Sequence, residues 1–117
     1  MKLLNIPHQV PIRFAQEILA LTQTSAKIKA VFPFVPTLGM LIEAAAQSSA
    51  AFCFDSTKIG LLVALKEVKL LKKPLNLDMI VNITIETSVG QLTEISFSIV
   101  NEEEIFATGR IILKISE

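Results

Sequence analysis

The chain has 117 residues, enough for one hydrophobic core but not for two. Hydrophobic residues make up 51% of it, whereas the 11 basic and 11 acidic side chains balance to a formal net charge of zero. A neutral chain without Trp or Tyr lacks the positive field and the stacking surface that nucleic acids favour, which argues against such a partner. We therefore expect a single domain over residues 1–117 that covers apolar surface in a homodimer or a larger homo-oligomer.

The opening segment, "MKLLNIPHQVPIRF", has no apolar run long enough for a signal peptide, and Pro7 and Pro11 interrupt it. The single cysteine, Cys53, rules out a disulfide within the chain, which suits a reducing cytoplasm. The longest apolar stretch, residues 38–53, is shorter than the roughly 20 residues of a membrane span and contains Glu43. We therefore expect a cytoplasmic protein without a membrane span.

The first half of the chain predicts two strands followed by one helix. The strands are "EILALTQ" and "AKIKAVF", on either side of a turn at Thr24–Ser25. A helix over about residues 37–53 is indicated by apolar and small residues at spacings of three and four, with Thr37 as a cap; they are Leu38, Leu41, Ile42, Ala45, Ser49 and Phe52. Several alanines keep this helix thin, so it can lie very close to a sheet.

The second half predicts four more strand segments. "KIGLLVALKEVKLLKKPL" is a long strand that ends at Pro74, because proline cannot donate to the ladder. Strict alternation of apolar and polar residues over 79–116, with turns at "SVGQ" and "NEEE", predicts an antiparallel meander of three strands. Gly109 within the last strand indicates a bulge or a close approach. One central helix wrapped by a long antiparallel sheet is an α+β architecture.

Three stretches resemble the 3-hydroxyacyl-[acyl-carrier-protein] dehydratases of the hot-dog fold. "IPHQVPIRFAQEIL" resembles their P-H-x-x-P opening, and "FPFVPTLGMLIEAAAQ" is similar to their H-F-P-G…E-A-x-A-Q signature. "VALKEVKLLKKPLNLDMIV" resembles their later strand and the entry to the next one. The three occur in the family's order and cover nearly the whole chain, so the resemblance implies a hot-dog fold.

The resemblance also implies an activity and a site. Members of that family convert a 3-hydroxyacyl thioester on acyl carrier protein to a trans-2-enoyl thioester and water, with neither metal nor redox cofactor. Carried over to this sequence, their catalytic glutamate is Glu43, with Gln47 as its neighbour. Gly39 matches the glycine whose N–H faces the thioester carbonyl, and a helix amino terminus suits such a role. Met40 and Gln47 are expected to bind the substrate beside it.

The sequence departs from the family at the residue before Phe32-Pro33, which is Val31 rather than the catalytic histidine. Two proton transfers need two groups, so this departure predicts weakened dehydratase activity and leaves two alternatives open. One is an acyl thioesterase in which Glu43 activates water, on carrier protein or CoA substrates. The other is a non-catalytic acyl-binding or assembly subunit, in which Glu43 and Gln47 form a polar stripe at a subunit edge.

The remaining polar residues suggest structural roles. His8 is the only histidine, but it matches a non-catalytic position of the resembled family. Cys53 is expected to pack, and Asp55 and Asp78 to lie in loops or turns, and no spacing suggests a metal site. The sequence also contains a basic cluster, which consists of Lys66, Lys69, Lys72 and Lys73, with Arg13 and Arg110 of unknown position. It is either a strand edge whose lysines prevent pairing with other strands or a docking surface for an acidic carrier protein.

Overall fold

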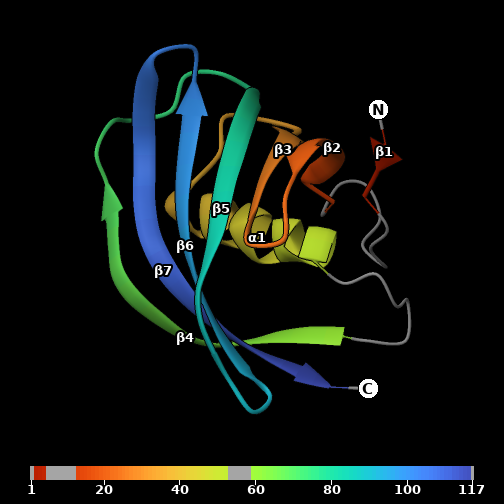
Figure 1. The fold of residues 1–117 in the computed structure, drawn as a ribbon. Coiled ribbons are helices and arrows are strands. Elements are labelled where there is room, and N and C mark those ends of the chain that lie inside the picture. Colours follow the sequence, from red (N-terminus) through yellow and green to blue (C-terminus); the bar gives the residue numbers. More distant parts are fainter. Residues whose placement is uncertain (1, 5–12, 53–58, 117) are drawn as a thin grey trace.

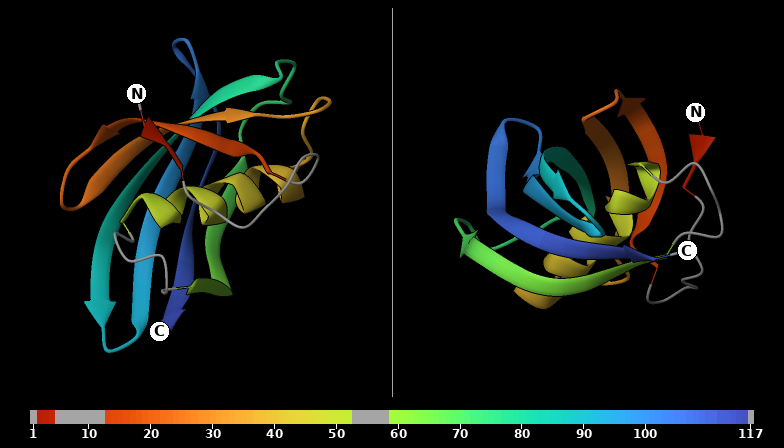
Figure 2. Two further views of the ribbon diagram at one scale, coloured as in Figure 1. Left: turned by 90° about the vertical axis from the view of Figure 1, so that its right-hand side faces the viewer. Right: turned by 60° about the horizontal axis from the view of Figure 1, so that its bottom comes forward.

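The computed structural model describes residues 2–4, 13–52 and 59–116, so the expectations for His8, Cys53 and Asp55 lie outside the described residues. The described part holds seven strands and one helix that ends in a 3-10 turn. In chain order these are β1 Lys2–Leu3, β2 Ala15–Leu21, β3 Ser25–Val31, α1 Leu38–Ser48, the 3-10 turn η1 Ser49–Phe52, β4 Ile59–Leu70, β5 Asp78–Val89, β6 Leu92–Asn101 and β7 Glu104–Ser116. The sheet curves around α1, as Figures 1 and 2 show from three sides.

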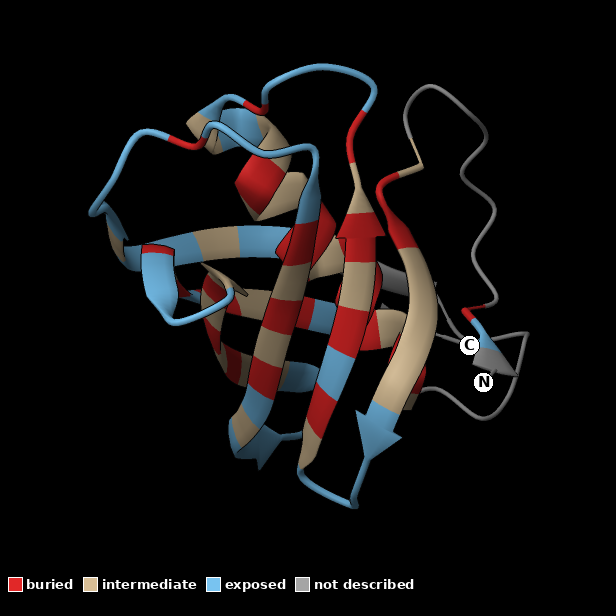
Figure 3. Cartoon of the chain, turned by 90° about the horizontal axis from the view of Figure 1, so that it is seen from above, coloured by how far each residue is buried: buried red, intermediate tan, exposed pale blue. Residues whose placement is uncertain are grey.

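All strand pairs are antiparallel, in the order β1-β2-β3-β5-β6-β7-β4. The α+β prediction is therefore confirmed, with one helix against one long antiparallel sheet. The predicted meander is also confirmed, because β5 pairs with β6 and β6 with β7 through turns at Gly90 and Glu102, both at positive φ. Buried and less buried residues alternate along these strands (Figure 3), as the sequence pattern predicts. Asp78, expected in a turn, is the first residue of β5.

The long strand β4 lies at one edge of the sheet and pairs with β7. Its register shifts between Lys66 and Lys69, where Glu67 has a φ of 50°, so the intervening residues bulge opposite Gly109. A Cβ on Gly109 would lie 2.9 Å from the Val68 Cγ2 and from two ring atoms of Phe97. Gly109 therefore marks both a bulge on the neighbouring strand and a close approach, as expected.

The helix begins as predicted but ends earlier. The Thr37 Oγ1 accepts a hydrogen bond from the Met40 N–H at 3.2 Å, so Thr37 is the N-cap. At the other end, the Ser49 N–H bonds to the Ala46 carbonyl three residues back, which is 3-10 geometry. The predicted helix over 37–53 is thus an α-helix over 38–48 continued by η1, and Cys53 lies outside the described residues.

The core lies between α1 and the inner face of the sheet. The side chains of α1 buried there are small or apolar and let the helix approach the sheet closely; they include Leu41, Ala44, Ala45 and Ser48. The short β1 strand had no pattern in the sequence and pairs with β2 through Lys2 and Leu3. Among the described residues, no helix is long and apolar enough to cross a membrane.

Candidate functional site

Gln47 is the one buried amide on α1, with 3% of its surface exposed. Its Oε1 accepts two hydrogen bonds from the backbone where β2 begins, from the Phe14 N–H at 2.8 Å and the Ala15 N–H at 3.1 Å. A buried N–H without an acceptor costs free energy, and the Gln47 side chain supplies an acceptor to two backbone N–H groups at this point. Gln47 therefore fastens the start of β2 to the middle of the helix.

The other end of the same amide contacts Glu43. The Gln47 Nε2 donates a hydrogen bond of 3.3 Å to the Glu43 Oε1. Residues four apart lie on one face of a helix, one turn from each other, so the E-A-A-A-Q spacing places this carboxylate and this amide together. Glu43 itself is half-buried. The structure thus brings together two of the four residues that the resemblance selects.

Gly39 and Met40 lie at the amino terminus of the helix, one turn before Glu43. The N–H of Met40 is held by the Thr37 side chain, and the N–H of Leu41 by the Thr37 carbonyl at 3.1 Å. Within the described part of the chain, the Gly39 N–H has no acceptor, as expected for the first turn of a helix. Gly39 is exposed, and a free N–H in the first turn of a helix can donate to a negatively charged oxygen.

Val31 is the last residue of β3, and hydrogen bonds of the Phe14 backbone connect it to Gln47. Its N–H donates to the Phe14 carbonyl at 2.9 Å, and the N–H of the same Phe14 is the one bound by Gln47. Along β3 the buried residues are Ala26, Ile28 and Ala30, so the Val31 side chain lies on the opposite face from α1. A side chain at position 31 therefore does not face Glu43 of its own chain.

Sequence reasoning missed the part of Phe14. Its ring is buried and lies 5.0 Å from the Phe32 ring, centroid to centroid. Its backbone joins Val31 to Gln47, but a backbone N–H and carbonyl carry no mark in the sequence.

The predicted basic cluster divides into ion pairs and exposed lysines. On the outer face, the Lys66 Nζ lies 2.9 Å from the Glu94 Oε1, and an Arg110 nitrogen lies 3.6 Å from the Glu94 Oε2. The hydrogen bond from Lys66, together with the positive charges of Lys66 and Arg110, lowers the pKa of Glu94 below its ordinary value. Lys72 pairs with Glu104 at 2.8 Å, whereas Lys69 and Lys73 are exposed. Three of the six residues of the cluster are thus in exposed ion pairs, namely Lys66, Lys72 and Arg110.

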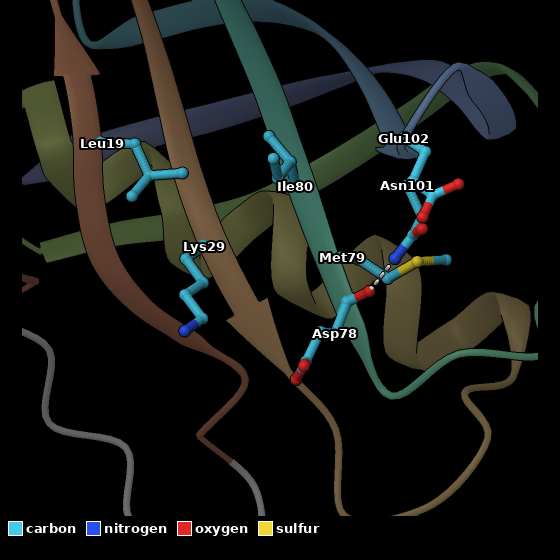
Figure 4. A pocket seen from close by; sticks show the side chains of 7 residues that line it. All are labelled: Leu19, Lys29, Asp78, Met79, Ile80, Asn101 and Glu102. Carbon is cyan, nitrogen blue, oxygen red and sulfur yellow. Dashed lines mark hydrogen bonds between the residues drawn. The ribbon is translucent and has the colours of Figure 1, made fainter.

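The outer face also carries a shallow cavity of about 300 Å³ (Figure 4). Its lining residues come from β2, β3, β5, β6 and the turn that follows, and none belongs to α1; they are Leu19, Lys29, Asp78, Met79, Ile80, Asn101 and Glu102. The Asn101 amide donates to the Asp78 carbonyl at 2.7 Å and closes one side of it. Among the described residues, no group of three or more His, Cys, Asp or Glu side chains could hold a metal ion.

No protein-family model matches the sequence, and no curated protein sequence matches it. Solved structures do match. A chain of the dehydratase heterocomplex ApeI:P from Xenorhabdus doucetiae is 14% identical, with a TM-score of 0.77 over 96% of this chain and 88% of that one. A thioesterase from Haemophilus influenzae is 16% identical, with a TM-score of 0.68 over 86% and 78%. A hypothetical thioesterase from Streptococcus pneumoniae, solved with coenzyme A, is 14% identical, with a TM-score of 0.65 over 86% and 84%.

At such identities the likeness establishes the fold. The chain has the α+β hot-dog fold, with one helix wrapped by an antiparallel sheet, and its structural neighbours include dehydratases and thioesterases. The expected hot-dog fold is therefore confirmed. The fold does not distinguish the 3-hydroxyacyl-[acyl-carrier-protein] dehydratases, which the sequence resembles, from the thioesterases. Structural neighbours named for both activities share it.

Proposed function

We propose that this protein acts on acyl thioesters at the amino-terminal half of α1, and that its reaction is the dehydration of 3-hydroxyacyl thioesters. The observation that carries the proposal is the pairing of Glu43 with a buried, backbone-anchored Gln47, one turn after an open helix N-terminus. This arrangement supplies a proton-transfer group and a donor for developing negative charge on one short stretch of helix. The E-A-A-A-Q stretch resembles the dehydratase signature at the same residues.

The proposed roles follow from the chemistry. Dehydration removes a proton from the carbon beside the thioester carbonyl, and the hydroxyl group leaves with a second proton as water. Glu43 delivers the proton to the departing hydroxyl group, and the Gly39 N–H donates to the carbonyl oxygen as negative charge develops there. Met40 contacts the acyl group next to the thioester carbonyl. Because position 31 holds Val, which cannot accept a proton, and its side chain lies on the other face from Glu43, we assign the base to a second subunit.

A thioesterase is the second candidate, and one observation favours it. Hydrolysis needs a single carboxylate that activates water, and Glu43 held by Gln47 meets that need without a histidine at position 31. Two of the structural neighbours described above are named thioesterases, one of them solved with coenzyme A.

One panel of substrates distinguishes the two reactions. Purified protein is incubated with 3-hydroxyacyl and trans-2-enoyl thioesters, each on CoA and on acyl carrier protein, and the products are separated by mass spectrometry. Dehydratase activity interconverts the two acyl groups with the thioester intact, whereas thioesterase activity releases free thiol. Glu43→Gln keeps an acceptor oxygen for Gln47 and should abolish turnover. If neither product forms with the wild type, the proposed activity is wrong.

We propose further that the protein is a homodimer joined through β4. This strand is a long sheet edge whose apolar side chains are 40–52% exposed at Leu62, Val63 and Leu65. An edge strand with free backbone groups and apolar side chains favours pairing with another strand, and a second copy of β4 offers the same surface in return. Pairing would also cover part of the apolar surface that a chain of 51% hydrophobic residues exposes.

The dimer is tested by light scattering coupled to size-exclusion chromatography. Leu65→Lys places a charge on the edge and should shift the wild-type dimer toward monomer. The matched control is Val89→Lys, because Val89 is 70% exposed but lies at the tip of the β5–β6 hairpin, and β6 and β7 separate β5 from β4. Equal masses for the wild type and Leu65→Lys would show that β4 is not the interface.

The carrier of the acyl group and the compartment are parts of the same proposal. Lys69 and Lys73 are exposed and, unlike Lys66 and Lys72, are outside the ion pairs of the described residues. We propose that they contact an acidic acyl carrier protein, so Lys69→Glu with Lys73→Glu should raise KM for carrier-bound substrates and leave KM for the CoA forms unchanged. The single cysteine is consistent with the cytoplasm as the compartment.

A further inference from the structure

We infer that Gln47 is a positioning residue that sets the direction of the Glu43 carboxylate from the first residues of β2. The inference rests on the proposed function, because it assigns a role to Gln47 at the same site. It differs from the role that the sequence suggested, which was contact with the substrate.

The two ends of the Gln47 amide cannot be exchanged. Its Oε1 lies between two N–H donors, Phe14 N and Ala15 N, and an amide nitrogen at that position would face donors instead of accepting from them. The opposite end is therefore the Nε2 donor, and it is directed at Glu43. Burial of Gln47 to 3% exposure restricts the side chain to this orientation. The carboxylate thus has a fixed N–H donor on one oxygen, and that donor is oriented by the sheet.

The residues that fix the orientation of the Glu43 carboxylate, acting through Gln47, therefore lie outside the helix. Phe14 is held on both sides of its backbone, by Gln47 through the N–H and by Val31 through the carbonyl. The residues that bind Gln47 lie 32 and 33 positions earlier in the chain. A shift of β2 against α1 would therefore turn the amide and the carboxylate together, whereas the intrinsic flexibility of a surface glutamate would leave it in several rotamers.

Two substitutions separate anchoring from positioning. Gln47→Glu keeps an acceptor oxygen for the Phe14 and Ala15 N–H groups but replaces the donor that faces Glu43 by a second carboxylate oxygen. That oxygen either repels Glu43 or shares a proton with it, and both outcomes change the proton-transfer group. Gln47→Leu removes both functions. We expect kcat to fall about 10- to 100-fold in Gln47→Glu with KM within about threefold of the wild type, a loss typical of a misplaced catalytic group.

A double-mutant cycle distinguishes positioning from a general structural effect. In the Glu43→Gln background there is no carboxylate to position, so Gln47→Glu should cause no further loss of activity. Independent, multiplying losses from the two substitutions would overturn the inference.

A spectroscopic measurement tests the inference even if the wild type turns over no thioester, which would overturn only the proposed function. The side-chain amide of Gln47 is observed by 15N–1H NMR in the wild type and in Glu43→Ala. The inference predicts slowly exchanging Nε2 protons whose resonances shift, and whose exchange with water accelerates, when the carboxylate is removed. Unchanged resonances and exchange would show that the Gln47 amide is not coupled to Glu43, and the inference would be wrong.

Discussion

Polar contacts on the inner and the outer face of this sheet differ in what they hold together. On the inner face, the Gln47 amide is buried and binds two backbone N–H groups and the Glu43 carboxylate. On the outer face, Glu94 binds Lys66 and Arg110, whose side chains are 51% and 44% exposed. Water can replace the partners of the outer cluster but not those of the inner one, so the inner contacts determine structure and the outer ones add little.

The largest effect is expected from Gln47→Leu. The substitution leaves the Phe14 and Ala15 N–H groups buried without their acceptor, and each such group costs about 1–3 kcal/mol. We predict a loss of about 2–5 kcal/mol in the free energy of unfolding, measured by urea denaturation. Glu43→Gln is the matched control and should lose clearly less, because it keeps Gln47 and the oxygen that accepts from Phe14 and Ala15. Equal losses would mean that the two N–H groups do not depend on the side-chain oxygen.

A smaller loss is expected from Gly109→Ala, which tests packing on the same inner face. The new Cβ would lie 2.9 Å from Phe97 ring atoms and from the Val68 Cγ2, so one of them must move. Overpacking of this kind costs about 1–3 kcal/mol. Gly39→Ala is the matched control, because its Cβ would lie 3.8 Å from the nearest atom, the Thr37 Oγ1, at ordinary contact distance. Thermal unfolding should separate the two variants, and a Tm for Gly109→Ala at or above that of Gly39→Ala would contradict the close approach.

The smallest effect is expected from Glu94→Gln on the outer face, and it depends on pH. The pKa of Glu94 in the folded chain is below its ordinary value of 4.5, chiefly because Lys66 donates a hydrogen bond to it. Its contribution to stability is therefore present above pH 4.5 and is lost as the pH falls through the lowered pKa. The wild type should have a slightly higher Tm than Glu94→Gln near pH 7, and the two should converge at strongly acidic pH. If the difference in Tm between the wild type and Glu94→Gln grew as the pH fell, the ion pair would not be the source of the lowered pKa, and the prediction would be wrong.

The same contrast explains which parts of the molecule could be predicted from the sequence. In the meander, the polarity of each residue of β5, β6 and β7 indicates whether it lies on the inner or the outer face of the sheet. The alternation over 79–116 was therefore sufficient to predict these three strands. The pairing of β4 with β7, and not with β5, could not be read in this way, because partners far apart in the chain leave no local pattern. The same holds for β1, which has two residues.

The site was predictable in part for a related reason. The four-residue spacing of Glu43 and Gln47 places them on one helix face, so their contact follows from the sequence. The binding of Gln47 to Phe14 and Ala15 involves backbone groups, which every residue carries and no residue type marks. Val31 was noted as a departure from the resembled family, but the face on which it lies became clear only from the alternation of β3 in the folded chain.

The claim that Glu43 performs proton transfer on a thioester is tested most directly by the rate of hydration of a trans-2-enoyl thioester, followed as loss of the conjugated chromophore. Wild type and Glu43→Gln are compared at equal concentration, and circular dichroism confirms that both are folded. Our account predicts hydration by the wild type and a loss of at least about 100-fold in Glu43→Gln. Equal rates for the two proteins, or a wild type without activity, would contradict it.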